Sequence, residues 1–298
     1  MVKHTVAVCN YNMVETVERS LRAMLDQLDD TFEMVVVDGG SQDGSLEILR
    51  DLEDEYEMLR VVSLRPDSDR YLGADRNTSF EASAGEYILE SLDCDDYYDN
   101  IIVDFTDLYH QIEEQVDFEF MLHGWGINIA PRSLLLDVPY YNLGGAEDRD
   151  LWRRLFARDA MIWLQHDSIG CSLGYEKSLM DEINRDIHGK ICDFQSGITL
   201  KSALEWSLSH PQYGIVEKDR SYPARQLKKA WDFGTHLYAY AKARGRPHHE
   251  APEQFKEKGS VEKYIYENRM TVSDIEETYG IEIDTDRLSK LGQKRLVK

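Results

Sequence analysis

Three aspartates occur within four residues, Asp93-Cys94-Asp95-Asp96, directly after an apolar run that ends at Leu92. Carboxylates this close repel one another unless a cation lies among them. Carboxylate oxygens are preferred ligands of Mg²⁺ and Mn²⁺, and Mg²⁺ usually keeps coordination positions open for substrate phosphates. The cluster therefore predicts a divalent metal site that receives a diphosphate. The alternative is a solvated acidic turn that caps the following helix.

A second polar loop, Asp38–Ser45 (DGGSQDGS), follows the apolar run Met34–Val37. Its glycines let the backbone approach a ligand closely, and Asp38 could accept a hydrogen bond from a nucleoside. The loop is neither a GxGxxG motif nor a Walker loop, because the spacing differs and the lysine is absent. An ordinary turn with a helix N-cap is the alternative explanation.

The pair Glu147-Asp148 follows two glycines and precedes an amphipathic segment with Leu151, Leu155 and Phe156 on one side. One carboxylate of the pair is a candidate general base that accepts a proton from an acceptor hydroxyl. Acidic residues also favour helix N-termini because of the helix dipole, so the pair has a structural explanation as well.

These loops must be positioned by alternating strands and helices. β-rich runs predict strands, and apolar residues at helical spacing predict the helices between them. The expected strands are residues 5–9, 34–37, 59–64, 87–92 and a strand-like region at 118–130, and the expected helices are near residues 14–28, 45–52, 74–84 and 101–114. In such an α/β sheet, ligands bind at the carboxyl ends of the strands.

Beyond residue 174 the apolar residues thin out and helical patterns dominate. We therefore expect a catalytic domain over residues 1–174 and a mainly helical region over residues 175–298, which binds the acceptor or a membrane surface. Near its end, Ser273 with Glu276 predicts a capping box, and Gly280 predicts the end of that helix.

A basic and aromatic segment, residues 224–249, contains the single acid Asp232 among six lysines and arginines. Its aromatic residues are Trp231, Phe233, Tyr238 and Tyr240. Such a segment predicts peripheral contact with anionic lipid headgroups or with a phosphate-linked lipid acceptor. The alternative is an amphipathic helix that packs its aromatic side chains on the catalytic domain.

Composition narrows the class of protein. The 298 residues include 56 acidic and 34 basic ones, a net charge of −22 that argues against a general nucleic-acid binder. Such a charge fits either salt adaptation or an ordinary acidic protein.

No apolar run approaches a membrane span, and the N-terminus lacks the sections of a secretory signal, so we expect a cytoplasmic protein. The four cysteines form no CxxC pair, so they predict neither a zinc site nor a disulfide framework.

Together, the order and spacing of these motifs resemble family 2 inverting glycosyltransferases with a GT-A fold. The resemblance covers roughly residues 4–170 and rests on six stretches: Val8–Asn12, Val36–Ser45, Ala74–Asn77, Ala84–Ile88, Leu92–Asp96 and Glu147–Arg154. It implies a Rossmann-like nucleotide-diphospho-sugar transferase, with a mixed, mostly parallel sheet flanked by helices and a helical C-terminal extension.

By position, the resemblance also implies roles for single residues. Asp93 and Asp95 would hold Mn²⁺ or Mg²⁺, and Asp148 would be the catalytic base. The donor would be bound by Cys9, Asn10, Tyr11, Asp38, Arg76 and Asp93. Secondary candidates are Asp96, Glu147 and, as a histidine ligand of the metal, His166 or His188.

Two departures from the family pattern bear on the donor. Gly39 stands where many relatives have a second aspartate that helps to hold the nucleobase, and Cys9 replaces a common proline. A uridine donor is therefore an expectation from the family alone.

The expected activity is that of a hexosyltransferase, which moves a sugar from a nucleotide diphosphate donor, UDP-sugar favoured, to a hydroxyl of a glycan or lipid-linked acceptor. A sugar-nucleotide-forming nucleotidyltransferase is one alternative, but it needs a glycine-rich basic loop where this chain has Asn10–Met13. A non-catalytic sugar-nucleotide-binding scaffold is the other, and the intact Asp93, Asp95 and Asp148 argue against it.

Overall fold

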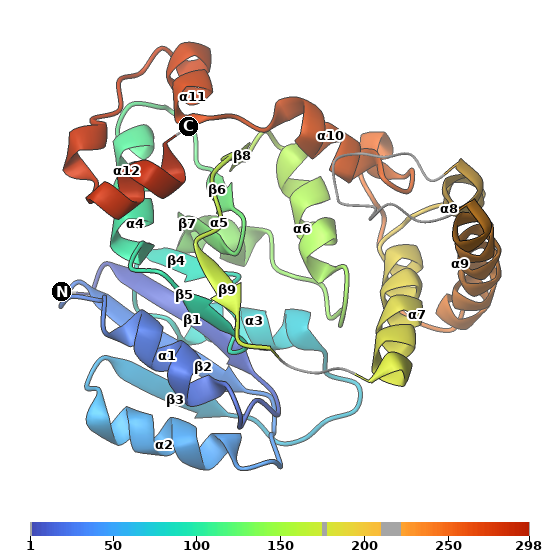
Figure 1. Cartoon of the computed structure of the whole chain (residues 1–298), viewed down its shortest axis with the longest axis horizontal. Helices are drawn as coiled ribbons and strands as arrows, with labels where there is room; N and C mark the ends of the chain where they lie inside the picture. Colours follow the sequence, from blue (N-terminus) through green and yellow to red (C-terminus); the bar gives the residue numbers. More distant parts are fainter. Residues whose placement is uncertain (1, 175–177, 210–221, 298) are drawn as a thin grey trace. The chain divides into compact units, whose positions relative to one another are not determined.

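The computed structural model describes residues 2–174, 178–209 and 222–297 (Figure 1). These residues form two compact units. Unit 1 comprises Met1–Tyr140, Asp159–Glu176 and Arg269–Lys298, and unit 2 comprises Tyr141–Arg158 and Lys177–Asn268. The predicted domain boundary at residue 174 adjoins residues 175–177, which lie outside the described residues, and the assignment of residues 1–174 to catalysis stays a prediction.

Unit 1 is built on a seven-stranded sheet with the order β3-β2-β1-β4-β7-β6-β8. All neighbours in it pair in parallel except β7, which is antiparallel to both β4 and β6. A separate two-stranded sheet pairs β5 with β9. The strands are β1 (His4–Asn10), β2 (Phe32–Asp38), β3 (Leu59–Ser63), β4 (Tyr87–Glu90), β5 (Asp96–Tyr98), β6 (Met121–Gly124), β7 (Ile127–Pro131), β8 (Met161–Trp163) and β9 (Gly170–Ser172).

Helices cover both faces of this sheet, as predicted. Figure 1 shows α1 and α2 side by side, and they contact each other; α3 packs on β1 and β2 and contacts α5. The unit 1 helices are α1 (Val17–Leu25), α2 (Ser45–Glu55), α3 (Leu72–Ala82), α4 (Ile102–Glu113), α5 (Arg132–Asp137), α11 (Val272–Tyr279), η2 (Thr285–Arg287) and α12 (Lys290–Leu296). The first helix is shorter at both ends than expected, and before its start the backbone N–H of Val14 donates to Asp43 Oδ2 (2.9 Å) in the neighbouring loop.

The sheet order explains where the polar loops meet. β1 lies between β2 and β4, so Asn10 at the end of β1 pairs with Asp38 at the end of β2. The chain winds from β1 toward β3 and then returns to the other side of β1 with β4, which makes a topological switch point. The loops after β1, β2 and β4 therefore leave the same edge of the sheet.

The C-terminal segment belongs to unit 1, which the sequence analysis did not predict. Its buried Ile275, Ile281, Leu288 and Leu296 join the main hydrophobic core. Helix α11 ends at Gly280 in a left-handed conformation (φ 66°), as predicted. The predicted capping box was wrong, since Thr271 and Asp274 form it. Helix α11 begins at the buried Val272, one residue before Ser273, so Ser273 lies inside the first turn.

Unit 2 is helical in its described part, as predicted for this region. Its helices are α6 (Glu147–Phe156), α7 (Leu179–Gln195), α8 (Leu200–Ser209), α9 (Tyr222–Ala243), η1 (Glu253–Phe255) and α10 (Ser260–Asn268). α9 contacts α7 and α8 around a small core that includes Phe194, Ala203 and Ala239. No helix in the described ranges is both long and apolar enough to cross a membrane.

We predict that Gly292→Ala destabilises the protein although alanine is the better helix former. A Cβ at position 292 would lie 2.9 Å from the Cβ of Asp104 and closer still to its carboxylate. Asp104 cannot easily move, because it accepts hydrogen bonds from the backbone N–H (2.8 Å) and the hydroxyl (2.5 Å) of Ser289. Overpacking of this kind costs about 1–3 kcal/mol, measurable as a lower midpoint in urea unfolding.

The matched control is Gly234→Ala in α9, where an added Cβ meets nothing within 4 Å. This change should stabilise the protein by up to about 1 kcal/mol through helix propensity alone. Equal effects of the two substitutions would contradict the packing of α12 on Asp104.

Candidate active site

The predicted acidic cluster lies in the loop after β4. The carboxylate oxygens of Asp93, Asp95 and Asp96 lie within 4.8 Å of one another, and within the described ranges they form the group that could hold a metal ion. The loop is fixed beside the first strand by a bridge between Asp93 and Cys9 and by the Asp93 N–H, which donates to the Tyr98 hydroxyl (2.7 Å). Three hard oxygen donors at this spacing fit Mg²⁺ or Mn²⁺.

The alternative explanation was a solvated acidic turn that caps the following helix, and the capping part of it is wrong. Asp96 begins β5, and the N-cap of the next helix, α4, is Ile101. The carboxylates therefore do not relieve their repulsion at a helix N-terminus.

The electrostatics of the cluster call for a positive charge. Desolvation, followed by the charges of Asp95 and Asp96, raises the pKa of Asp93 from its usual value to about 6, although Arg76 opposes the shift. Burial and then the charge of Asp95 also raise the pKa of Asp96. A cation among the three oxygens would favour their ionised forms, so the residues fit a metal site.

Arg76 faces this cluster from a buried position on α3. Its Nη1 donates to Glu90 Oε2 (3.0 Å), and its Nη2 lies 3.9 Å from Asp93 Oδ1. Glu90, at the end of β4, also accepts hydrogen bonds from the Tyr140 hydroxyl (2.9 Å) and the Asn128 amide. Glu90 thus balances the buried guanidinium and aims it at the acidic loop. The sequence analysis missed Glu90, although a glutamate that ends an apolar strand was a visible signal.

Asp38 is fully buried and organises the loop after β2. One carboxylate oxygen accepts from Asn10 Nδ2 (2.8 Å) and the Ser41 hydroxyl (2.5 Å). The other accepts from the backbone N–H groups of Gly40 (3.1 Å) and Ser41 (3.0 Å). Asp38 and Asn10 therefore shape the predicted nucleoside site from beneath, and their direct contact with a nucleoside stays a prediction.

A second carboxylate occupies the space beside Gly39. A Cβ on Gly39 would lie 2.9 Å from Asp75 Oδ2 and 3.4 Å from the ring of Tyr11. Asp75 is held by Arg70, whose Nε donates to Asp75 Oδ1 (2.7 Å) and whose Nη2 donates to the Gly39 carbonyl (2.7 Å). Burial raises the pKa of Asp75. The sequence analysis noticed the missing aspartate at position 39 but not the one that α3 supplies.

Cys9, Tyr11 and His166 are three further candidates from the sequence. Burial raises the pKa of the Cys9 thiol to about 12, so the thiol is neutral, and Tyr11 beyond it is 60% exposed. His166 has both ring nitrogens near backbone groups: Nε2 accepts from the Trp125 N–H (2.7 Å), and Nδ1 lies 2.5 Å from the Asp167 carbonyl oxygen. This geometry gives no support to His166 as a metal ligand.

The pair Glu147-Asp148 forms the first turn of α6 in unit 2. Ala146 before it adopts a left-handed conformation (φ 65°), which turns the chain sharply into the helix. Glu147 is buried, whereas Asp148 is partly exposed, and its Oδ1 accepts from the Arg149 N–H (2.6 Å). Asp148 is therefore the carboxylate of the pair that solvent reaches. Its role as the base stays a prediction.

Comparisons with known proteins find similar sequences and similar folds. The family model described as glycosyl transferase family 2 matches residues 5–135. A cholesterol galactosyltransferase of Borreliella burgdorferi is 28% identical over 149 residues, which are 49% of this chain and 40% of that protein. The chain thus spans less than half of that relative.

Solved structures show the same fold. S. aureus TarS in complex with UDP-GlcNAc matches with a TM-score of 0.51 and 17% identity over 82% of this chain and 92% of that chain. The mannosyltransferase PcManGT from Pyrobaculum calidifontis, in complex with GDP-Man and Mn²⁺, matches with the same TM-score and identity over 82% and 75%. The chain therefore has a GT-A fold, and its residues 5–135, from β1 to β7, are similar to glycosyl transferase family 2.

Proposed function

We propose that this protein transfers a sugar from a nucleotide diphosphate donor to a hydroxyl of a glycan or lipid-linked acceptor, with inversion. The observation that carries the proposal is the cluster of Asp93, Asp95 and Asp96 within 4.8 Å at the switch-point edge of the sheet. Buried Arg76 adds a fixed positive charge 3.9 Å from Asp93. No feature of the described residues favours a nucleotidyltransferase or a non-catalytic scaffold over this activity.

Each group has a defined task in the reaction. Asp93 and Asp95, with Asp96 beside them, would hold Mn²⁺ or Mg²⁺, and a bound ion would supply positive charge that neutralises a diphosphate leaving group. Arg76 adds electrostatic stabilisation from the protein itself. Asp148 accepts the proton of the acceptor hydroxyl. The oxygen of that hydroxyl attacks the anomeric carbon of the donor sugar from the side opposite the leaving group. A single displacement of this kind inverts the anomeric centre.

We also propose that the nucleobase is uracil or another base with an imino N–H. An ionised carboxylate only accepts hydrogen bonds, so Asp75 can bind the N3–H of uracil but not the N3 lone pair of cytosine. Tyr11, 60% exposed and beside Gly39, offers a ring on which the base can stack. The nucleotides in the two fold relatives, UDP-GlcNAc and GDP-Man, both carry an imino N–H.

A membrane contact through α9 is the remaining part of the proposal. Leu227 (73% exposed), Trp231 (45%) and Tyr238 (51%) recur at helical spacing and form an exposed stripe. Lys242 lies 5.5 Å from the ring centre of Tyr238, and Arg225 is exposed near the start of the same helix. Exposed aromatic side chains with basic neighbours favour the anionic membrane interface. The alternative explanation, a helix that packs its aromatic side chains on the catalytic domain, would have required these side chains to be buried.

For catalysis, we predict that Asp148→Asn lowers kcat at least 100-fold, because an amide cannot accept the acceptor proton. Asp95→Asn should lower activity to a similar degree and weaken Mn²⁺ binding, measured by titration calorimetry. Release of UDP from a UDP-sugar gives the rate. The control is Asp159→Asn, which changes an exposed acid just beyond the same helix. Turnover of folded Asp148→Asn within a few-fold of wild type would refute its role.

For the nucleobase, we predict that the wild type binds UDP at least tenfold more tightly than CDP in the presence of Mn²⁺, and that Asp75→Asn removes most of this preference. The asparagine amide can both donate and accept hydrogen bonds, so it can bind the N3–H of uracil and the N3 lone pair of cytosine alike. Isothermal titration measures both affinities, with Glu81→Gln, an exposed change on the same helix, as the control. If Asp75→Asn still prefers UDP to CDP, residues other than Asp75 recognise the base.

For the membrane, we predict that the protein floats with vesicles containing 30% phosphatidylglycerol at moderate salt but not with pure phosphatidylcholine vesicles. Replacing Leu227, Trp231 and Tyr238 together by serine should abolish flotation while the protein stays folded, because these side chains are exposed. Absence of wild-type flotation on the anionic vesicles would dismiss the membrane contact.

A further inference from the structure

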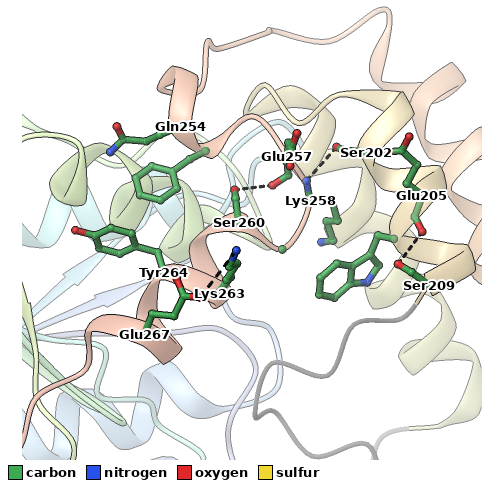
Figure 2. Close-up of a pocket in the computed structure, with 13 residues that line it drawn as sticks. Ser202, Glu205, Ser209, Gln254, Glu257, Lys258, Ser260, Lys263, Tyr264 and Glu267 are labelled. Atoms are coloured by element: carbon green, nitrogen blue, oxygen red, sulfur yellow. Dashed lines mark hydrogen bonds and ion pairs between the residues drawn. The ribbon is translucent and has the colours of Figure 1, made fainter.

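Unit 2 contains a cavity of about 720 Å³ between α8 and the start of α10 (Figure 2). Figure 2 shows Gln254 and Tyr264 on one side of it and Glu205 and Ser209 on the other. Its volume falls within the roughly 300–1,000 Å³ typical of small-molecule sites. All of its lining residues belong to unit 2, and neither the metal cluster nor the base is among them.

The aromatic walls of the cavity are rigidly built. Gly259 has φ +83°, and a Cβ on it would overlap the six-membered ring of Trp206, so glycine allows the indole to lie against the backbone where α10 begins. Tyr264 on α10 is held by Phe156 (ring centroids 4.8 Å) and by an edge contact with Phe255 (5.5 Å). Both Trp206 and Tyr264 keep part of their surface accessible to solvent.

The polar lining is rich in hydrogen-bond acceptors and slightly acidic. The carboxylates of Glu205, Glu257 and Glu267 outnumber the ammonium groups of Lys258 and Lys263. Lys258 is already paired with the buried Asp193, so its charge is balanced inside the protein. Such a lining repels phosphates and nucleotides but accepts hydrogen bonds from neutral hydroxyl groups.

We propose that this cavity binds a neutral saccharide segment of the acceptor glycan, an inference that rests on the proposed sugar transfer. The apolar C–H faces of the sugar pack on Trp206 and Tyr264, as is usual for aromatic walls of ligand sites. Its hydroxyls donate to Glu205 and Glu257, and the Gln254 amide both donates and accepts. The site therefore selects an uncharged, hydroxyl-rich ligand.

One connection joins this cavity to the proposed base. Asp193 binds Lys258 of the cavity, and its Oδ1 also lies 3.9 Å from Arg149 Nε and 3.5 Å from Arg153 Nη2 on α6. Although burial opposes it, the charges of Lys258, Arg149 and Arg153 keep the pKa of Asp193 well below its usual value, so the network is ionised. Arg149 directly follows Asp148, so one buried ion-pair network fixes both the saccharide site and the helix that carries the base.

Saturation-transfer NMR with maltotriose, cellotriose and mannotriose tests the proposal on the whole protein. We expect transfer to at least one trisaccharide, and at least tenfold weaker binding in Trp206→Ala and Glu205→Gln. The glutamate variant keeps the test valid if loss of the indole unfolds unit 2, because Glu205 is exposed. Trp125→Ala, an exposed tryptophan in unit 1 and outside the cavity, is the matched control and should bind as the wild type does.

Several outcomes would overturn the proposal: no transfer to any trisaccharide, binding that Trp206→Ala and Glu205→Gln leave unchanged, or binding of inorganic phosphate or UDP that these variants weaken. Hydrolysis of a UDP-sugar by the wild type, measured alongside, separates this proposal from the proposed function. Hydrolysis without saccharide binding rejects the cavity alone. Saccharide binding without hydrolysis of any nucleotide sugar tried rejects the transferase and leaves a glycan-binding site.

Discussion

The buried ion pair between Arg76 and Glu90 is the constraint on which the acidic cluster of unit 1 depends. A buried charge without a partner costs several kcal/mol, so each of these side chains requires the other. Tyr140 and Asn128 donate the remaining hydrogen bonds to Glu90. Side chains from α3, β4, β7 and the end of the first segment of unit 1 therefore meet at this one carboxylate. The acidic loop begins three residues later, and its position follows from this anchor.

The sequence predicted the parts of the site that are local in the chain. Asp93, Asp95 and Asp96 were found because residue type and spacing alone identify a cluster of oxygen donors. Asp75 beside Gly39 and Tyr140 beside Glu90 were missed, because each pair is joined only by the packing of distant elements. The place of the last thirty residues in unit 1 was missed for a similar reason: their few apolar side chains form a buried face only against α4 and the sheet.

Charge is distributed unevenly between the interior and the surface. Unit 2 draws Lys190, Arg153 and Lys258 into buried or half-buried pairs with Asp232 and Asp193. Among the described residues, eight acids and three bases are buried, so the interior holds part of the acidic excess behind the net charge of −22 and the surface stays strongly negative. The exposed aromatic and basic stripe of α9 is an exception on this acidic surface. An anionic membrane would repel the rest of the surface and attract this stripe, so the charge difference would orient the protein on the membrane.

The three-part composition of unit 1 has a consequence for biosynthesis. All strands of its two sheets have been made once β9 is complete, but the core remains open until the C-terminal segment containing Leu288 and Leu296 arrives. During translation, unit 2 emerges from the ribosome as an insertion that can collapse first, since domains generally fold as units. The nascent part of unit 1 must therefore wait, with apolar surface uncovered, for residues 269–298.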